Sequence, residues 1–479
     1  MTKLNKNKPI KNNNDNRMDI LESMPIKKAI WALAIPTMLA MLIQVIYNMT
    51  DTFFIGKLNE PNMVAAISIS FPIFMIVQAF GNIFAIGGAS LISRLLGKGE
   101  VEQANHAGAI AFWTAFSVCA VVAILGLIFT EPILLFCGAS ENTIGYASSY
   151  LRIMLIGGLF IGMQMAMGGL LRSEGATKES MVGMMTGSII NIVLDPIFIL
   201  FLNMGVAGAA WATTIGNMFA FLYFVNFYMK KKGIISISPK LFSFDKKIYA
   251  DIFKIGIPAS LGMILMSVGM AVGNVFAASF GDDVVAANGI VMRVGNIAIM
   301  LAMGLAQGCQ PLMGYNYGAK KYDRLLETIK RSSLISTIMC CFFAAIYFVF
   351  ANVWIKIFIN DVTVVNLGVK IMRVFVLGMP FIGIQMILMI MFQSLGRSVE
   401  SLVLSLGRQG FFFIPALIIF SNLWGFDGFI FALPFADIAT SLLSISLFII
   451  LRKKLHLSRD ALIRDEERSY IDDQLLDNN

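Results

Sequence analysis

Apolar residues follow one another along this chain in twelve long runs, separated by short charged segments. Each run holds at least the roughly 20 residues that a helix needs to cross the hydrocarbon core of a bilayer. The runs cover residues 29–55, 62–92, 107–130, 144–171, 180–203, 205–229, 255–281, 284–308, 332–355, 371–396, 401–426 and 428–451. The pattern predicts an all-α polytopic membrane protein with twelve transmembrane helices.

Composition and charge agree with this prediction. The chain is 57% hydrophobic and 14% charged, which is typical of a membrane protein. If the N-terminus lies inside, thirty of the 37 Lys and Arg fall in inside segments, and only Lys57, Lys356 and Lys370 fall in outside loops. The positive-inside rule then places both termini in the cytoplasm. The topology explains the net charge of +8, so we expect no nucleic-acid binding.

The two halves of the chain repeat each other at an offset of 221 residues. Arg152, Gly157, Phe160, Gly162, Gln164 and Met165 recur as Arg373, Gly378, Phe381, Gly383, Gln385 and Met386, and Gly87 and Gly97 recur as Gly308 and Gly318. Six helices per half predict two pseudo-symmetric lobes in a parallel repeat, with a substrate path between them and alternating access by rocking. We expect a tail at 1–26, lobes at 27–229 and 255–451, a cytoplasmic linker at 230–254 and a tail at 452–479.

Acidic residues inside apolar runs are the strongest functional signal, because an intramembrane charge is unfavourable unless it has a role. Asp51 lies in the first run and Asn191 and Asp195 lie in the fifth, whereas the counterpart regions of the second half lack acids. Helical spacing puts Gln44, Tyr47, Asn48 and Asp51 on one face. Pro36 and Pro196 are candidate hinges, and Pro196 frees a carbonyl one turn back. Two carboxylates with amide and carbonyl oxygens could hold a hard cation or share a proton.

Other polar and flexible residues are candidate substrate contacts. Asp437 lies near the middle of the last run, and either contacts substrate or pairs with an intramembrane Arg such as Arg293 or Arg408. Methionines repack easily around different apolar ligands, and the chain has 31 of them. The remaining candidates are Met263, Met266, Met292, Gln164 and Gln385.

Catalytic and metal-binding motifs are missing from the sequence. It has no H-E-x-x-H, no G-x-S-x-G and no phosphate loop. Its two histidines, His106 and His456, fall outside the apolar runs, and its five cysteines lack ligand spacing. We therefore expect neither an enzyme nor a cofactor, and no metal beyond a sodium ion at the acid site.

Several motifs give the chain a specific resemblance. Pro36 and Asp51 are separated by fourteen residues, Asn191, Asp195 and Pro196 form N-x3-DP, and GAAWAT follows at 208–213. With two six-helix lobes, these features resemble the multidrug and toxic compound extrusion (MATE) family over about residues 27–451. The resemblance implies a cation-coupling site of Asp51, Asn191, Asp195 and Thr213, with Tyr47 beside it. Because the seventh, eighth and tenth runs lack acids, the chain is more similar to the DinF-like branch, and to MepA-like exporters of Gram-positive bacteria.

This resemblance implies an efflux antiporter in the bacterial cytoplasmic membrane. It would act as a monomer and export amphipathic, cationic compounds in exchange for H⁺ or Na⁺. The sequence leaves open the natural substrate, the coupling ion and the role of Asp437. A lipid or lipid-linked-substrate flippase of a related fold is the alternative, and an Arg-lined groove would favour it.

Overall fold

The protein is built from helices. The computed structural model describes residues 13–56 and 60–477, and these ranges contain no strand. The expected loop at Lys57 lies outside them. The first half forms α1 (Asn13–Glu22), α2 (Ile26–Gly56), α3 (Pro61–Gly97), α4 (Val101–Ile128), α5 (Thr130–Phe136), α6 (Ile144–Ser173), α7 (Thr177–Pro196), the π-helical η1 (Ile197–Phe201) and α8 (Gly205–Met229).

The second half repeats this order with more interruptions. It forms the 3₁₀ turn η2 (Pro239–Leu241), α9 (Lys246–Ser279), α10 (Asp282–Gly318), α11 (Tyr322–Val349), α12 (Ala351–Lys356), α13 (Val362–Phe375), α14 (Met379–Ser394), α15 (Ser398–Leu406), the π-helical η3 (Gly407–Phe413) and α16 (Ile414–Asp477).

The predicted twelve spans are confirmed once two breaks are taken into account. In the described ranges, ten helices are long and apolar enough to cross a membrane, and α13 with α14 forms an eleventh span bent by 51°. The segment Ser398–Leu455 contains two spans, because Gly425 inside α16 has a non-helical backbone (φ 60°, ψ −132°). Glycine tolerates this positive φ without a side-chain clash.

The bend between α13 and α14 is a difference between the lobes. The first-lobe counterpart of this pair is α6, which runs unbroken from Ile144 to Ser173. Pro380 lies at the first turn of α14, where the first lobe has Leu159. Proline lacks the amide hydrogen that would continue the helical ladder and is tolerated best at the start of a helix. The proline therefore explains why one span is divided in the second lobe only.

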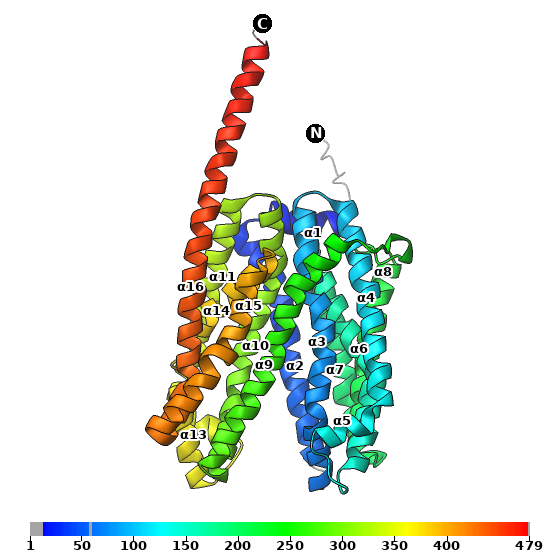
Figure 1. The fold of residues 1–479 in the computed structure, drawn as a ribbon, viewed down its shortest axis with the longest axis vertical. Helices are drawn as coiled ribbons and strands as arrows, with labels where there is room; N and C mark the ends of the chain where they lie inside the picture. Colours follow the sequence, from blue (N-terminus) through cyan, green and yellow to red (C-terminus); the bar gives the residue numbers. More distant parts are fainter. Residues whose placement is uncertain (1–12, 57–59, 478–479) are drawn as a thin grey trace, which may run out of the picture.

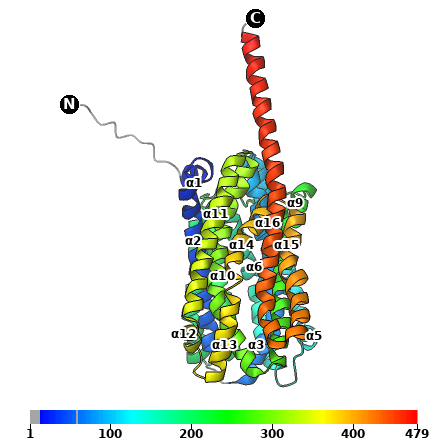
Figure 2. The ribbon, with the colours of Figure 1, turned by 90° about the vertical axis from the view of Figure 1, so that its left-hand side faces the viewer.

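Both ends of the bundle can be told apart in the figures. Helix α1 and the end of α16 lie at the same end, which we call the terminal face, and the opposite end is the distal face (Figures 1 and 2). Helix α16 continues beyond the bundle at the terminal face (Figure 1). The expected tail at 452–479 is thus helical as far as Asp477.

Two more boundaries differ from the predicted ones. Residues 13–22 of the expected N-terminal tail form α1, and α9 begins at Lys246, so 246–254 are helical rather than linker. The Asp245 side chain caps α9 by accepting a hydrogen bond from the Lys247 amide at 2.8 Å. A helix need not stop where its apolar run stops, because charged residues continue it outside the hydrocarbon layer.

Repeat-related glycines bring the two lobes into backbone contact. Gly87 of α3 lies against the backbone of Ile252 in α9, and its counterpart Gly308 of α10 lies against Ala34 in α2. Gly97 and Gly318 make the equivalent contacts between α3 and α10. All four contacts lie in the half of the bundle nearer the terminal face. Toward the distal face, α9 diverges from α2 and α3 (Figure 1).

Gly308→Ala is predicted to destabilise the protein, and Gly289→Ala on the same helix is the matched control. An added Cβ at Gly308 would lie 2.6 Å from the Ala34 Cα and 2.8 Å from the Leu33 carbonyl oxygen, whereas one at Gly289 would meet nothing within 4 Å. Overpacking against backbone costs about 1–3 kcal/mol, while Gly→Ala in an open helix position is favourable by roughly 0.5–1 kcal/mol. Thermal unfolding of the purified variants should therefore give a lower midpoint for Gly308→Ala than for Gly289→Ala, and equal midpoints would contradict tight packing of the lobes.

Candidate functional site

The polar residues of the predicted first-lobe site converge from three helices near the distal face. Asp51 lies in the last two turns of α2, Asp195 in the last turn of α7 and Thr213 in the third turn of α8. Asp195 is 0% exposed and Asn191 is 2% exposed. The Asn191 side-chain amide donates a hydrogen bond to the Thr213 hydroxyl at 3.2 Å. The structure thus brings the acids of α2 and α7 together with the amide and hydroxyl groups between α7 and α8.

Four buried oxygen atoms of this cluster have no hydrogen-bond partner among the described residues. They are Oδ1 of Asp51, Oδ1 of Asn191 and both carboxyl oxygens of Asp195. An unpaired polar group in an apolar environment is unfavourable by several kcal/mol, and an unpaired charge by more. The cluster is therefore chemically incomplete as a set of protein groups alone. A proton on a carboxyl group or a small cation among these oxygens would complete it.

Two tyrosines border the carboxyl groups. The Tyr47 side chain lies close to Thr213 and within electrostatic range of Asp51 and Asp195. Tyr150 of α6 lies within the same range of both acids, and we did not predict it from the sequence. Its counterpart at the repeat offset is Ile371, so the asymmetry that identified the acids would also have identified this tyrosine.

Close helix packing fixes the geometry of the cluster. Gly187 of α7 and Gly216 of α8 approach each other so closely that a Cβ at Gly216 would lie 2.5 Å from the Gly187 carbonyl oxygen and 3.2 Å from the Asn191 Cβ. Helix α7 ends at Pro196, and the wider π-helical turns of η1 follow directly. The irregular backbone therefore begins two residues after Asp195, at Ile197.

The other predicted residues of α2 are arranged less uniformly. Gln44 is half-buried and Asn48 is exposed, so Asn48 is the most accessible member of the predicted polar face. Pro36 is buried, and α2 continues through it as one helix. Any hinge at this proline must therefore form in another state of the protein.

The candidate substrate contacts are distributed over both lobes. Met263 and Met266 lie on α9, Met292 on α10, Gln164 on α6 and Gln385 on α14. Met266 is 36% exposed, whereas Gln385 is 2% exposed. The carbonyl oxygen of the Gln385 side chain is buried without a partner among the described residues.

Asp437 forms an ion pair inside the second lobe. Its Oδ1 accepts a hydrogen bond from Nε of Arg408 at 2.7 Å, and the two side chains are 1% and 12% exposed. Arg408 belongs to η3, whereas Arg293, the other candidate partner, is exposed. The pair favours the structural alternative for Asp437, because a carboxylate held by a guanidinium is already neutralised.

A conventional metal centre is not found in the described ranges, where no group of three or more His, Cys, Asp or Glu could hold a metal ion. The five cysteines are all free.

Comparison with known proteins agrees with the fold. The MatE family model matches residues 36–197 and 258–418. The chain is 31% identical over 452 residues to the multidrug export protein MepA of Staphylococcus haemolyticus, covering 94% of this chain and 100% of that protein. It is 30% identical to the MepA protein of Staphylococcus aureus, with 94% and 99% coverage. A solved structure described as the outward-facing conformation of a multidrug resistance MATE family transporter has a TM-score of 0.88 and 25% identity, covering 91% of this chain and 98% of that one.

Asp437→Leu is predicted to destabilise the second lobe by about 3 kcal/mol, because removing one partner of a buried ion pair leaves the other charge uncompensated. The double variant Asp437→Leu, Arg408→Leu should recover most of this loss, since neither charge then remains. Thermal unfolding midpoints of the single and double variants test the prediction. A double variant no more stable than Asp437→Leu would show that the ion pair does not account for the stability at this position.

Proposed function

This chain belongs to the MATE family of multidrug efflux transporters, and on that premise we propose that it is a secondary active antiporter which exports amphipathic cationic compounds in exchange for protons. The observation that carries the proposal is the set of unpaired buried oxygens on Asp51, Asn191 and Asp195. Binding a proton there removes a charge from an apolar site, which is the kind of energetic change that can drive a conformational step.

Two nearby carboxyl groups favour a proton as the coupling ion. Asp195 lies within electrostatic range of Asp51, and like charges in a low-dielectric site disfavour simultaneous ionisation. Sodium would instead need several oxygen ligands, for which Asn191 and Thr213 are available. We propose proton coupling, and sodium coupling is the alternative outcome of the test below.

The orientation in the membrane follows from charge. We propose that the terminal face is cytoplasmic, because the Lys- and Arg-rich segments lie there. The acid cluster is then near the extracellular side, and the glycine contacts close the cytoplasmic side. This matches the description of the related outward-facing structure, which is 25% identical.

The exchange requires that proton and drug bind in alternation. In the proposed cycle, proton entry from outside neutralises the acid cluster and α2 bends at Pro36, so that the drug leaves. Rocking of the lobes then exposes the site to the cytoplasm. The drug must bind the protonated and deprotonated states of the protein with different affinities. A proton that did not change the drug affinity would not drive the drug off.

An adaptable surface supports a broad range of amphipathic substrates. Met263 and Met292 are partly buried and Met266 is exposed on the second-lobe helices, and flexible thioethers can repack around different ligands. Flippase activity is less well supported, because three of the four arginines in the apolar runs have local contacts. Arg408 pairs with Asp437, Arg152 lies 3.5 Å from Glu131 and Arg373 stacks over Phe348.

Asp51→Asn and Asp195→Asn are each predicted to abolish ion-coupled efflux while leaving membrane insertion normal, because asparagine cannot exchange a proton. Efflux of ethidium from vesicles under an imposed pH gradient, and then under a sodium gradient, measures the effect and identifies the ion. Asp427→Asn is the matched control, since Asp427 is 58% exposed and pairs with Lys370. Full efflux by well-inserted Asp195→Asn protein would rule out this coupling site.

A further inference from the structure

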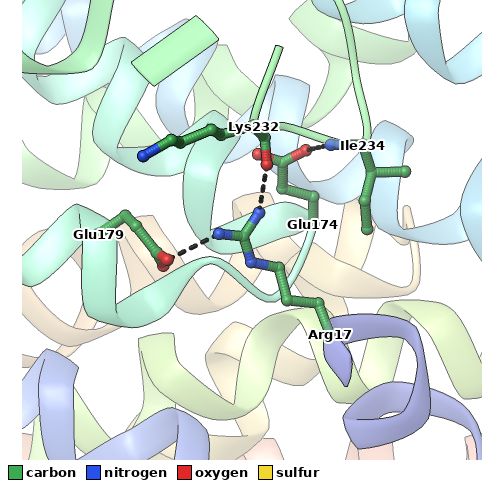
Figure 3. A network of polar contacts seen from close by, with 5 residues as sticks. All are labelled: Arg17, Glu174, Glu179, Lys232 and Ile234. Carbon is green, nitrogen blue, oxygen red and sulfur yellow. Dashed lines mark hydrogen bonds and ion pairs between the residues drawn. The ribbon is translucent and has the colours of Figure 1, made fainter. Parts of the chain in front are cut away.

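Helix α1 is anchored to the terminal face of the first lobe by one buried arginine. Nη2 of Arg17 donates a hydrogen bond to Oε1 of Glu179 in α7 at 2.6 Å, and Nη1 donates to the Lys232 carbonyl oxygen at 2.7 Å. The guanidinium also lies 5.1 Å from the ring centre of Phe227 in α8. Figure 3 shows Arg17 reaching from α1 between the two glutamates, Glu174 and Glu179. Arg17 is only 6% exposed, so these contacts are shielded from water.

A second glutamate holds the segment between the lobes at the same point. Glu174, in the turn between α6 and α7, accepts hydrogen bonds from the backbone amides of Ile234 at 2.6 Å and Ile235 at 2.9 Å. Complete burial raises the pKa of Glu174 to about 7, although the two amides and the Arg17 charge lower it in part and Glu179 raises it further. Arg17 thus offsets part of the free energy that burying this carboxyl group requires.

The segment before α9 is bound to the first lobe along much of its length. The Ser236 amide donates to Oδ1 of Asn105 at 2.7 Å, and Nε1 of Trp113 donates to the Ile237 carbonyl oxygen at 3.1 Å. Ile235 is only 3% exposed, so this part of the linker is packed rather than solvated. The linker therefore moves with the first lobe, and α1 rests on both.

The other end of α1 contacts the second lobe. Glu22 pairs with Lys321, at the turn between α10 and α11, at 3.3 Å. Just after α1, the Met24 carbonyl oxygen accepts a hydrogen bond from Nη2 of Arg324 in α11 at 2.6 Å. Leu21 is fully buried between these contacts. The ten-residue helix consequently spans the junction between the lobes.

The two attachments of α1 differ in strength. The Arg17 contacts are charge-assisted and buried, and such hydrogen bonds are among the stronger ones in proteins. On the second lobe, Arg324 donates a charge-assisted hydrogen bond to the Met24 carbonyl oxygen. Glu22 and Lys321 are 52% and 42% exposed, and exposed ion pairs are weak. The repeat-related segment before α9 contains only the short turn η2, so the described part of the second half has no equivalent of α1. The helix can therefore stay with the first lobe while it releases the second.

We propose that α1 is a latch which holds the terminal face closed, anchored by Arg17 to the first lobe and detaching from Lys321 and Arg324 when the lobes part on that face. This inference rests on the proposed alternating access, which requires the terminal face to open in each cycle. Arg17 is a positioning residue in this device, because it keeps Glu22 and Met24 where they meet the second lobe.

Distances between spin labels on the two lobes test the latch without substrate or ion gradient. The full chain is used, with its native cysteines replaced. One label is attached to a cysteine in place of Glu102, at the exposed start of α4, and the other to a cysteine in place of Lys330, at an exposed position of α11. Arg17→Ala and Arg324→Ala should each raise the ratio of long to short distances by about tenfold, the size expected for loss of a charge-assisted hydrogen bond. The control Arg331→Ala should leave the ratio unchanged, because Arg331 pairs with Glu327 within α11.

The result that would overturn the latch is an unchanged distance distribution in folded, monodisperse Arg17→Ala and Arg324→Ala proteins, even if their thermal stability falls. An equal shift in Arg331→Ala would overturn it as well. If Arg17→Ala does not fold, Arg324→Ala and Lys321→Met test the same junction from the second lobe. The proposed function fails separately, through loss of coupled ethidium efflux, since the distance measurement requires no transport.

Discussion

The structure depends on four buried oxygens of Asp51, Asn191 and Asp195 that have no hydrogen-bond partner among the described residues. Asp195 is 0% exposed, and neither of its carboxyl oxygens is paired. Such a group is stabilised when a proton, a cation or an ordered water joins it, or when the surroundings change. In the proposed mechanism, the site links occupancy by an ion to the conformation of the three helices that carry it, which is the requirement for an ion-driven transporter.

The two lobes share the same arrangement of helices but differ in their acidic residues and in one bend. Repeat-related glycines bring both lobes together with the same backbone contacts near the terminal face. The first lobe keeps α6 unbroken beside its acids, whereas the second lobe bends at Pro380 and neutralises its one deep acid with Arg408. The proposed coupling site therefore lies in the first lobe. The side chains of the second lobe are then free of the requirements of an ion site and can serve packing and contact with varied substrates.

Sequence reasoning predicted the elements governed by local composition. Long apolar runs fixed the twelve spans, and the mismatch between repeated halves identified Asp51, Asn191 and Asp195 as residues with a special role. It did not choose between Arg408 and Arg293 as the partner of Asp437, because that choice depends on the π-helical turns of η3. It also missed α1, whose polar sequence has no apolar stripe and which is held by the tertiary contacts of Arg17 and Leu21. Tyr150 was not predicted, because mismatches between the two halves were sought only among charged and amide residues. Its counterpart at the repeat offset is Ile371.

The most direct test of the central claim is the affinity of the purified protein for ethidium, measured against pH at fixed sodium and against sodium at fixed pH. If a proton at the first-lobe acids competes with the drug, affinity in the native protein rises as pH rises and changes little with sodium, and Asp51→Asn weakens the response to pH. Affinity that responds to neither ion, or that responds to pH identically in Asp51→Asn, would contradict the assignment of coupling to this site.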